Sequence, residues 1–140
     1  MTTFTSEQTT INRSAEYVFR FLSDFNHFGK LLPPQVTDWE CDEDSCSFNI
    51  QNMAKVALRY EIKKPFSHIK MVSEGNSSFK FDVQCFIADT SEQTCEVQLE
   101  LNAKLNPMLK MMASKSLANF IDILVAKLKE ICEEEPPAQV

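Results

Sequence analysis

Residues Pro107 to Cys132, with the sequence PMLKMMASKSLANFIDILVAKLKEIC, decide the fold of this 140-residue chain. The stretch has no glycine and no second proline, and Asn106 is placed to cap a helix with Pro107 in its first position. Its apolar residues form a broad stripe at helical spacing, made of Met108, Met111, Met112, Leu117, Phe120, Ile121, Leu124, Leu128 and Ile131. At about 1.5 Å per residue this helix would extend roughly 39 Å, so it needs a large concave partner.

The partner is predicted between Val36 and Ala103, where polar and apolar residues alternate as in an antiparallel sheet with one face in water. The alternation is cleanest in the last strand, where Cys95, Val97, Leu99, Leu101 and Ala103 share one face. A shift of one residue would expose every apolar side chain, so the register is strongly specified. We therefore expect these strands to form the concave partner of the long helix.

The chain before the sheet predicts one strand and two short helices. Thr3 to Ile11 is rich in threonine, but its weak alternation leaves the inward face undecided. Asn12 or Ser14 then caps a helix whose apolar positions are Tyr17, Val18, Phe21 and Leu22. A second helix is predicted from Asp24 to Leu32, and Pro33-Pro34 ends it.

Composition and charge indicate one globular domain. The chain is 44% hydrophobic and 24% charged, and no run approaches the roughly 20 apolar residues that cross a bilayer. We expect the domain to span residues 1–133 and to end in a disordered acidic and proline-containing tail, 134–140, with Glu133 already fraying. The net charge of -6 argues against nucleic acid and does not favour an anionic membrane surface. Five cysteines, an odd number, suit reduced thiols, so a cytoplasmic location is predicted.

The order of these elements, with three short motifs, resembles the helix-grip fold of the START-like, SRPBCC superfamily over nearly the whole chain. The motifs are residues 11–19 (INRSAEYVF), residues 21–25 (FLSDF) and residues 105–108 (LNPM). The chain looks similar to small single-domain bacterial members described as polyketide cyclase-like. The resemblance implies an α+β fold, in which a curved antiparallel sheet of about six to seven strands wraps around the long C-terminal helix, with a hydrophobic cavity between sheet and helix. It transfers no reaction, because one fold hosts many functions.

Apolar residues of the predicted strands and helix are candidates for lining that cavity. The candidate ligand-binding residues are Phe48, Leu58, Tyr60, Phe79, Phe81, Val97, Leu99, Met108, Met112, Phe120 and Leu124. Such a lining suits a lipid, polyketide or terpenoid-like guest. The same side chains would also fill an ordinary core at normal density, and the sequence leaves both interpretations open.

Residues that carry chemistry are scarce on the inward faces. His27, His68 and Tyr60 form no recognisable nucleophile arrangement, so no catalytic residue is assigned. Cys41 with Cys46, and Cys85 with Cys95 across a hairpin centred on Thr90, lack the short spacing of a zinc site, so neither metal nor cofactor is expected. The leading hypothesis is binding or transport of a small hydrophobic molecule. A cyclase or dehydratase-like enzyme and a co-chaperone-like interaction module are the alternatives, and the oligomeric state stays open.

Overall fold

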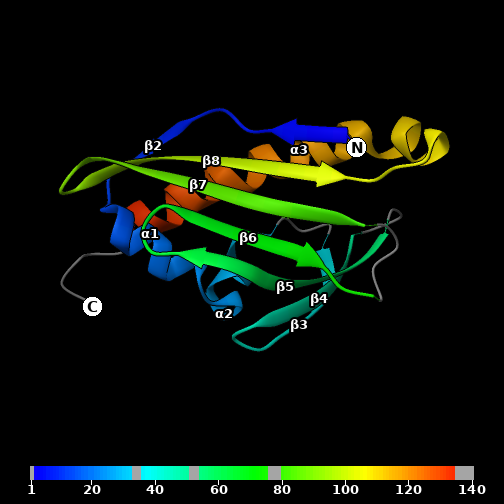
Figure 1. Cartoon of the computed structure of the whole chain (residues 1–140), viewed down its shortest axis with the longest axis horizontal. Helices are drawn as coiled ribbons and strands as arrows, with labels where there is room; N and C mark the ends of the chain where they lie inside the picture. The colour runs from blue at the N-terminus through cyan, green and yellow to red at the C-terminus, as the bar shows by residue number, and fades with distance from the viewer. Residues whose placement is uncertain (1, 33–35, 51–53, 76–79, 135–140) are drawn as a thin grey trace.

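The computed structural model describes residues 2–32, 36–50, 54–75 and 80–134. They form an antiparallel sheet with one long helix across one face and two short helices beside it (Figure 1). In chain order the elements are β1 (Thr2–Thr5), β2 (Thr9–Ile11), α1 (Ala15–Leu22), α2 (Phe25–Phe28), the 3-10 helix η1 (Gly29–Leu31), β3 (Val36–Cys41), β4 (Ser45–Ile50), β5 (Ala54–Lys64), β6 (His68–Ser73), β7 (Phe81–Ser91), β8 (Thr94–Ala103) and α3 (Pro107–Glu134). The predicted α+β architecture, a sheet gripping a C-terminal helix, is confirmed.

The sheet runs in the order β1-β8-β7-β6-β5-β4-β3, and β2 also pairs with β8. The β7–β8 register places Val83 opposite Leu101, and the β4–β5 register places Phe48 opposite Val56. All four of these side chains are buried. The predicted alternation therefore puts the apolar face of the sheet toward the helices, as the register argument requires.

The N-terminal strand differs from its prediction, because the expected single strand from Thr3 to Ile11 is two strands. Thr5 pairs with Glu100 and Thr9 pairs with Val97, so three residues of the first segment lie opposite two residues of β8. Ser6 occupies this bulge, where its N–H donates to the Leu99 carbonyl and its hydroxyl accepts from the Leu99 N–H. The extra residue reverses the alternation, which explains why the sequence pattern was weak. It also raises the strand count to eight.

The first entry helix begins at one of its two predicted caps, and the second begins directly after Asp24, where the predicted range started. The Ser14 hydroxyl accepts from the Tyr17 N–H at 3.1 Å, which selects Ser14 over Asn12 as the cap of α1. Asp24 caps the next segment, which divides into α2 and η1 instead of forming one helix to Leu32. Pro33 and Pro34 lie outside the described residues.

The helix α3 covers the apolar face of the sheet. Its N-terminus is capped by Asn106, whose side chain accepts from the Leu109 N–H at 2.8 Å. Its buried residues follow helical spacing and are Leu117, Ile121, Leu124, Val125, Leu128 and Cys132. The helix packs against β1, β2, β8 and η1. Its first turns project past the end of β8 (Figure 1). Across the described ranges, no helix is both long enough and apolar enough to traverse a lipid bilayer.

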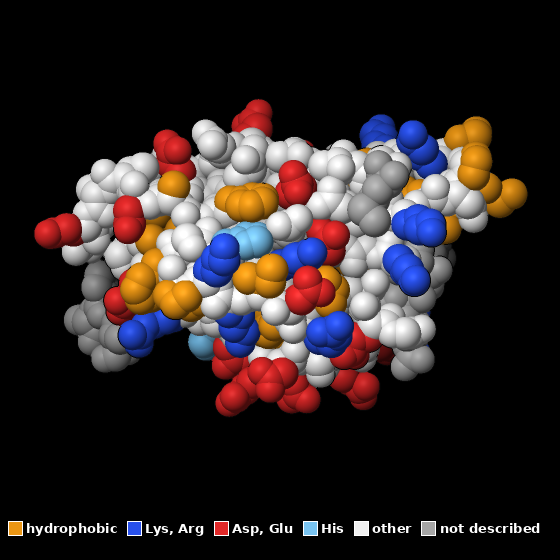
Figure 2. Space-filling model, viewed as in Figure 1, with side chains coloured by type: hydrophobic (Ala, Val, Ile, Leu, Met, Phe, Trp, Pro, Cys, Tyr) orange, Lys and Arg blue, Asp and Glu red, His pale blue; other side chains and the backbone are white. Residues whose placement is uncertain are grey.

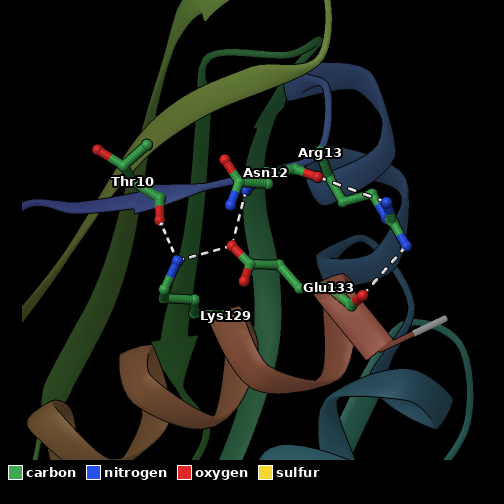
Figure 3. A network of polar contacts seen from close by, with 5 residues as sticks. All are labelled: Thr10, Asn12, Arg13, Lys129 and Glu133. Carbon is green, nitrogen blue, oxygen red and sulfur yellow. Dashed lines mark hydrogen bonds and ion pairs between the residues drawn. The ribbon is translucent and has the colours of Figure 1, made fainter.

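The last turn of α3 is fastened to the connection between β2 and α1 (Figure 3). The Glu133 carboxylate accepts from the Asn12 N–H at 2.8 Å and from the Lys129 ammonium at 2.6 Å. Lys129 also donates to the Thr10 carbonyl, and the Arg13 guanidinium donates to the Glu133 carbonyl. The prediction that Glu133 frays is wrong, because these donors outweigh its unfavourable position in the helix dipole. The rest of the predicted tail, 135–140, lies outside the described residues.

We expect Glu133→Gln to lower the free energy of unfolding by about 1 kcal/mol near pH 7, because the partly exposed site loses its charge-assisted hydrogen bonds. The hydrogen bond from Lys129, and next the one from the Asn12 N–H, hold the pKa of Glu133 below its ordinary value of 4.5. This stabilisation is therefore present above pH 4.5 and is lost as the pH falls through the lower, folded-state pKa.

Thermal melts of the wild type and the variant measure this effect. The melting temperatures should differ near pH 7 and should converge at a second, acidic pH well below 4.5. Glu134→Gln, at the exposed neighbouring position, is the matched control and should melt like the wild type. An unchanged difference at both pH values would contradict the role given to the carboxylate.

Candidate binding site between the sheet and the long helix

A small, partly open cavity lies between the sheet and α3. Its volume is about 20 Å³, roughly the space that one water molecule needs. The residues that line it are Phe28, Phe48, Ile50, Val56, Leu58, Phe81, Val83, Leu101, Leu117, Phe120 and Leu124. All of them are apolar, so the cavity offers dispersion contacts and no hydrogen bonds.

The lining side chains come together because the inward face of the strands packs against one side of the helix. Alternate residues of β4, β5, β7 and β8 point to the same face of the sheet. On α3, Leu117, Phe120 and Leu124 follow one another at spacings of three and four residues, which places them on one side of the helix. The aromatic ring of Phe28 enters from α2 and stacks on Trp39, which in turn contacts Phe48. The rings of Phe28 and Phe48 therefore border the cavity, and Trp39 packs against both of them.

The structure brings part of the predicted set together. Five predicted residues line the cavity, namely Phe48, Leu58, Phe81, Phe120 and Leu124. Val97 and Leu99 are buried in the same core but do not line the cavity. Phe79 lies outside the described residues.

The two predicted methionines occupy a different place. Met108 and Met112 are each 71% exposed, and neither lines the cavity. Their spacing does fit the apolar stripe of the helix. However, the first turns of α3 project past the end of β8, so this strand does not cover them (Figure 1).

Six lining residues were not among the predicted ligand contacts: Phe28, Ile50, Val56, Val83, Leu101 and Leu117. The sequence does place Ile50, Val56 and Val83 on inward faces of their strands. The sheet order and the path of the helix across the sheet decide which inward residues border a cavity. Neither can be inferred from a local sequence pattern.

Tyr60 is held by other parts of the fold. Its hydroxyl donates to the Leu22 carbonyl at 2.5 Å, and its ring stacks on Phe25 with centroids 4.3 Å apart. Burial raises the pKa of Tyr60 well above its usual range, so the hydroxyl stays protonated and remains a donor. Tyr60 thereby ties the end of α1 to β5, and it is not part of the cavity lining.

Both histidines also lie away from the cavity lining. The His68 ring stacks on Phe86, and its Nε2 lies 2.9 Å from the Gln84 side-chain oxygen. The His27 ring stacks on Phe21. No carboxylate accompanies either ring in these contacts, so the acid–base arrangement that an enzyme would need is not assembled at the cavity among the described residues.

The cysteines are all thiols. Burial raises the pKa of Cys46 to about 12 and that of Cys95 to about 11, so both remain protonated and unreactive. Cys85 and Cys95 do not face each other across the hairpin, because it pairs Cys85 with Leu99 and Cys95 with Asp89. Within the described part of the chain, no three His, Cys, Asp or Glu residues are grouped so as to hold a metal ion.

In comparisons of sequence, no protein-family model and no curated protein matches the chain. In comparisons of structure, it is similar to a START superfamily protein from Mycobacterium smegmatis, with a TM-score of 0.71 and 14% identity over 94% of this chain and 97% of that one. A conserved protein from Geobacillus kaustophilus has a TM-score of 0.75 and 13% identity, over 95% of this chain and 96% of that one.

A third similar structure belongs to an enzyme. Norcoclaurine synthase from Thalictrum flavum, solved in complex with dopamine and hydroxybenzaldehyde, has a TM-score of 0.70. It is 8% identical to this chain and covers 96% of it, with 89% of its own chain aligned. Identities this low establish the fold alone. The chain has the START-like helix-grip fold, as its resemblance in sequence predicted.

Proposed function

We propose that the protein binds a small hydrophobic molecule between the sheet and α3. The wholly apolar cavity at this position carries the proposal, with Phe48, Leu58, Phe81, Phe120 and Leu124 as the predicted contacts that line it. Hydrophobic ligand binding is familiar in START-like folds. Norcoclaurine synthase, which shares the fold, was solved with two small aromatic molecules.

The guest must displace side chains in order to enter. A typical small-molecule site encloses about 300–1,000 Å³, and the cavity holds about 20 Å³. Four of its lining residues are phenylalanines, carried by four different elements: Phe28, Phe48, Phe81 and Phe120. Changes in the rotamers of these rings would open space without unfolding a strand. Tyr60, Val97, Leu99, Met108 and Met112 remain predicted contacts for a larger guest.

Binding, storage or transport fits this lining better than catalysis does. A general acid or base has to touch the reacting atoms, and the cavity lining supplies only hydrocarbon. We place this function in the cytoplasm, because five reduced thiols suit a reducing compartment.

Native mass spectrometry of protein purified from its own host, followed by solvent extraction, tests the proposal directly. A stoichiometric apolar compound should leave the protein on extraction. A protein that carries no compound and also binds no apolar probe would support the packed-core interpretation.

A matched pair of variants assigns the site, with the fluorescent probe N-phenyl-1-naphthylamine as ligand. Val83→Phe adds a ring inside the cavity, and it should weaken probe binding at least about tenfold. Val72→Phe adds the same ring on β6 between Arg59 and Asp82, on the other face of the sheet, and should leave the affinity unchanged. Equal affinities in both folded variants would place the probe elsewhere.

A further inference from the structure

Three methionines at the start of α3 form the most exposed apolar group among the described residues. Met108, Met111 and Met112, here called the methionine tip, are 71%, 88% and 71% exposed. The next most exposed large apolar side chains, Phe66 and Phe86, reach 40%. Figure 2 shows hydrophobic side chains gathered where the first turns of α3 project from the molecule. An exposed apolar group of this kind marks a contact surface.

Positive charge surrounds the methionine tip although the protein is acidic. Lys104, Lys110 and Lys115 lie in the segment 101–121, which contains no Asp or Glu. Lys80 joins them, because the Lys104 N–H donates to the Lys80 carbonyl at 2.8 Å. All four lysines are exposed, and blue side chains flank the tip in Figure 2. These four lysines carry a charge of +4. The rest of the chain has 10 basic and 20 acidic residues, so its net charge is -10.

Among the residues that the structure describes, none of these four lysines takes part in a salt bridge. The salt bridges of the described residues involve Arg20, Lys70, Lys127 and Lys129, which lie elsewhere. The ammonium groups beside the tip are therefore available to an anionic partner. The acidic remainder of the molecule would turn away from such a partner, so the charge distribution sets an orientation as well as an attraction.

We propose that the methionine tip docks on the surface of an anionic lipid bilayer. The three flexible thioether side chains would enter the boundary between headgroups and acyl chains, while the lysines bind lipid phosphates. A long lysine stem lets the ammonium group stay at phosphate level as the apolar tip goes deeper. The net charge of the whole chain does not favour such a surface, but its uneven distribution does.

The composition of the tip favours a membrane over other partners. Protein interfaces concentrate their binding energy in buried Trp, Tyr and Arg side chains, and the segment 104–116 contains none of them. Single-stranded nucleic acid needs aromatic platforms for stacking, and this segment has no aromatic residue. Flexible methionines with point-like lysine charges suit a fluid surface that imposes no fixed geometry.

The tip lies beside the cavity described above. Leu117, which lines the cavity, follows Met112 by five residues, or about 7.5 Å along the helix. Phe81 also lines the cavity, and it follows Lys80 and pairs with Ala103 just before Lys104. Docking does not depend on the proposed binding function. If both hold, an apolar guest would leave the membrane close to its site.

Sedimentation of the full chain with lipid vesicles tests the proposal. The wild type should bind vesicles of phosphatidylcholine mixed with phosphatidylglycerol, should bind pure phosphatidylcholine vesicles at least about tenfold more weakly, and should be released by high salt. The triple variant Met108→Ser, Met111→Ser, Met112→Ser should lose at least about tenfold in affinity. Lys110→Gln with Lys115→Gln should lose at least about fivefold. Because these side chains are exposed, each variant should melt at the wild-type temperature.

The matched control removes apolar surface elsewhere. Ile123→Ser with Phe86→Ser changes side chains that are 37% and 40% exposed, and vesicle binding should stay at the wild-type level. Equal binding by the wild type and the triple methionine variant would overturn the proposal. So would the absence of wild-type binding to mixed vesicles, including the case in which the tip instead mediates self-association in sedimentation velocity or binds a protein.

Discussion

A chain that ends at Leu105, and so lacks α3, will show no cooperative thermal unfolding. Among the described side chains of α3, six are buried, including Leu117, Leu124 and Leu128. At about 1.5–3 kcal/mol for each buried apolar side chain, their loss is comparable with the whole stability of a typical domain, about 5–15 kcal/mol. Removing the helix also leaves the apolar face of the sheet open to water. We therefore expect a collapsed or aggregated chain without a fixed core.

Circular dichroism melts measure this outcome directly. The matched control is a chain that ends at Glu134, which keeps all of α3 and the contacts of Glu133, and it should melt cooperatively. A sharp transition in the chain that ends at Leu105 would show that the sheet is stable without the helix. The account of the core given above would then be wrong.

Leu124→Ala should lower the free energy of unfolding by about 2–5 kcal/mol, because it removes a fully buried side chain and enlarges an existing cavity. Chemical denaturation gives this value. The enlarged space is lined by apolar residues and should stay dry, so it should accept small apolar molecules such as benzene. Saturating benzene should therefore raise the melting temperature of the variant.

Leu128→Ala is the matched control for this experiment. Leu128 is fully buried on the same helix, four residues further on, but it does not line the cavity. Its replacement should cost a similar free energy of unfolding, since the same atoms leave a packed interior. Its new void would be separate from the existing one, so benzene should stabilise it less. Equal stabilisation of both variants would show that the cavity has no special capacity for guests.

Most of the architecture follows from local patterns in the sequence. The alternation from Cys95 to Ala103 predicts β8 and its buried face, because each apolar residue lies two positions after the last. The caps at Ser14 and Asn106 mark the starts of α1 and α3. These features depend on neighbouring residues alone, and the order of the elements then restricts how a sheet and one long helix can pack.

The features that the sequence did not reveal depend on contacts between distant segments. The bulge at Ser6 is defined by Leu99, and Glu133 is held by Asn12. The exposure of Met112 depends on where the sheet ends beneath the helix. About half of the cavity lining was predicted, because a strand pattern shows which residues point inward but not which of them leave space between them.

The pairing of β1 and β2 with β8 has a consequence for synthesis on the ribosome. Ile11 pairs with Cys95, so the ribosome must add 84 further residues after Ile11 before this pair can form. At about 5–20 residues per second this wait lasts roughly 4–17 s. Stalled nascent chains of increasing length should therefore become protease-resistant only after α3 has left the exit tunnel, and earlier protection would contradict this order. Before α3 emerges, the apolar face of the nascent sheet is exposed to solvent. Before β8 is synthesised, β1 and β2 also lack the strand with which they pair.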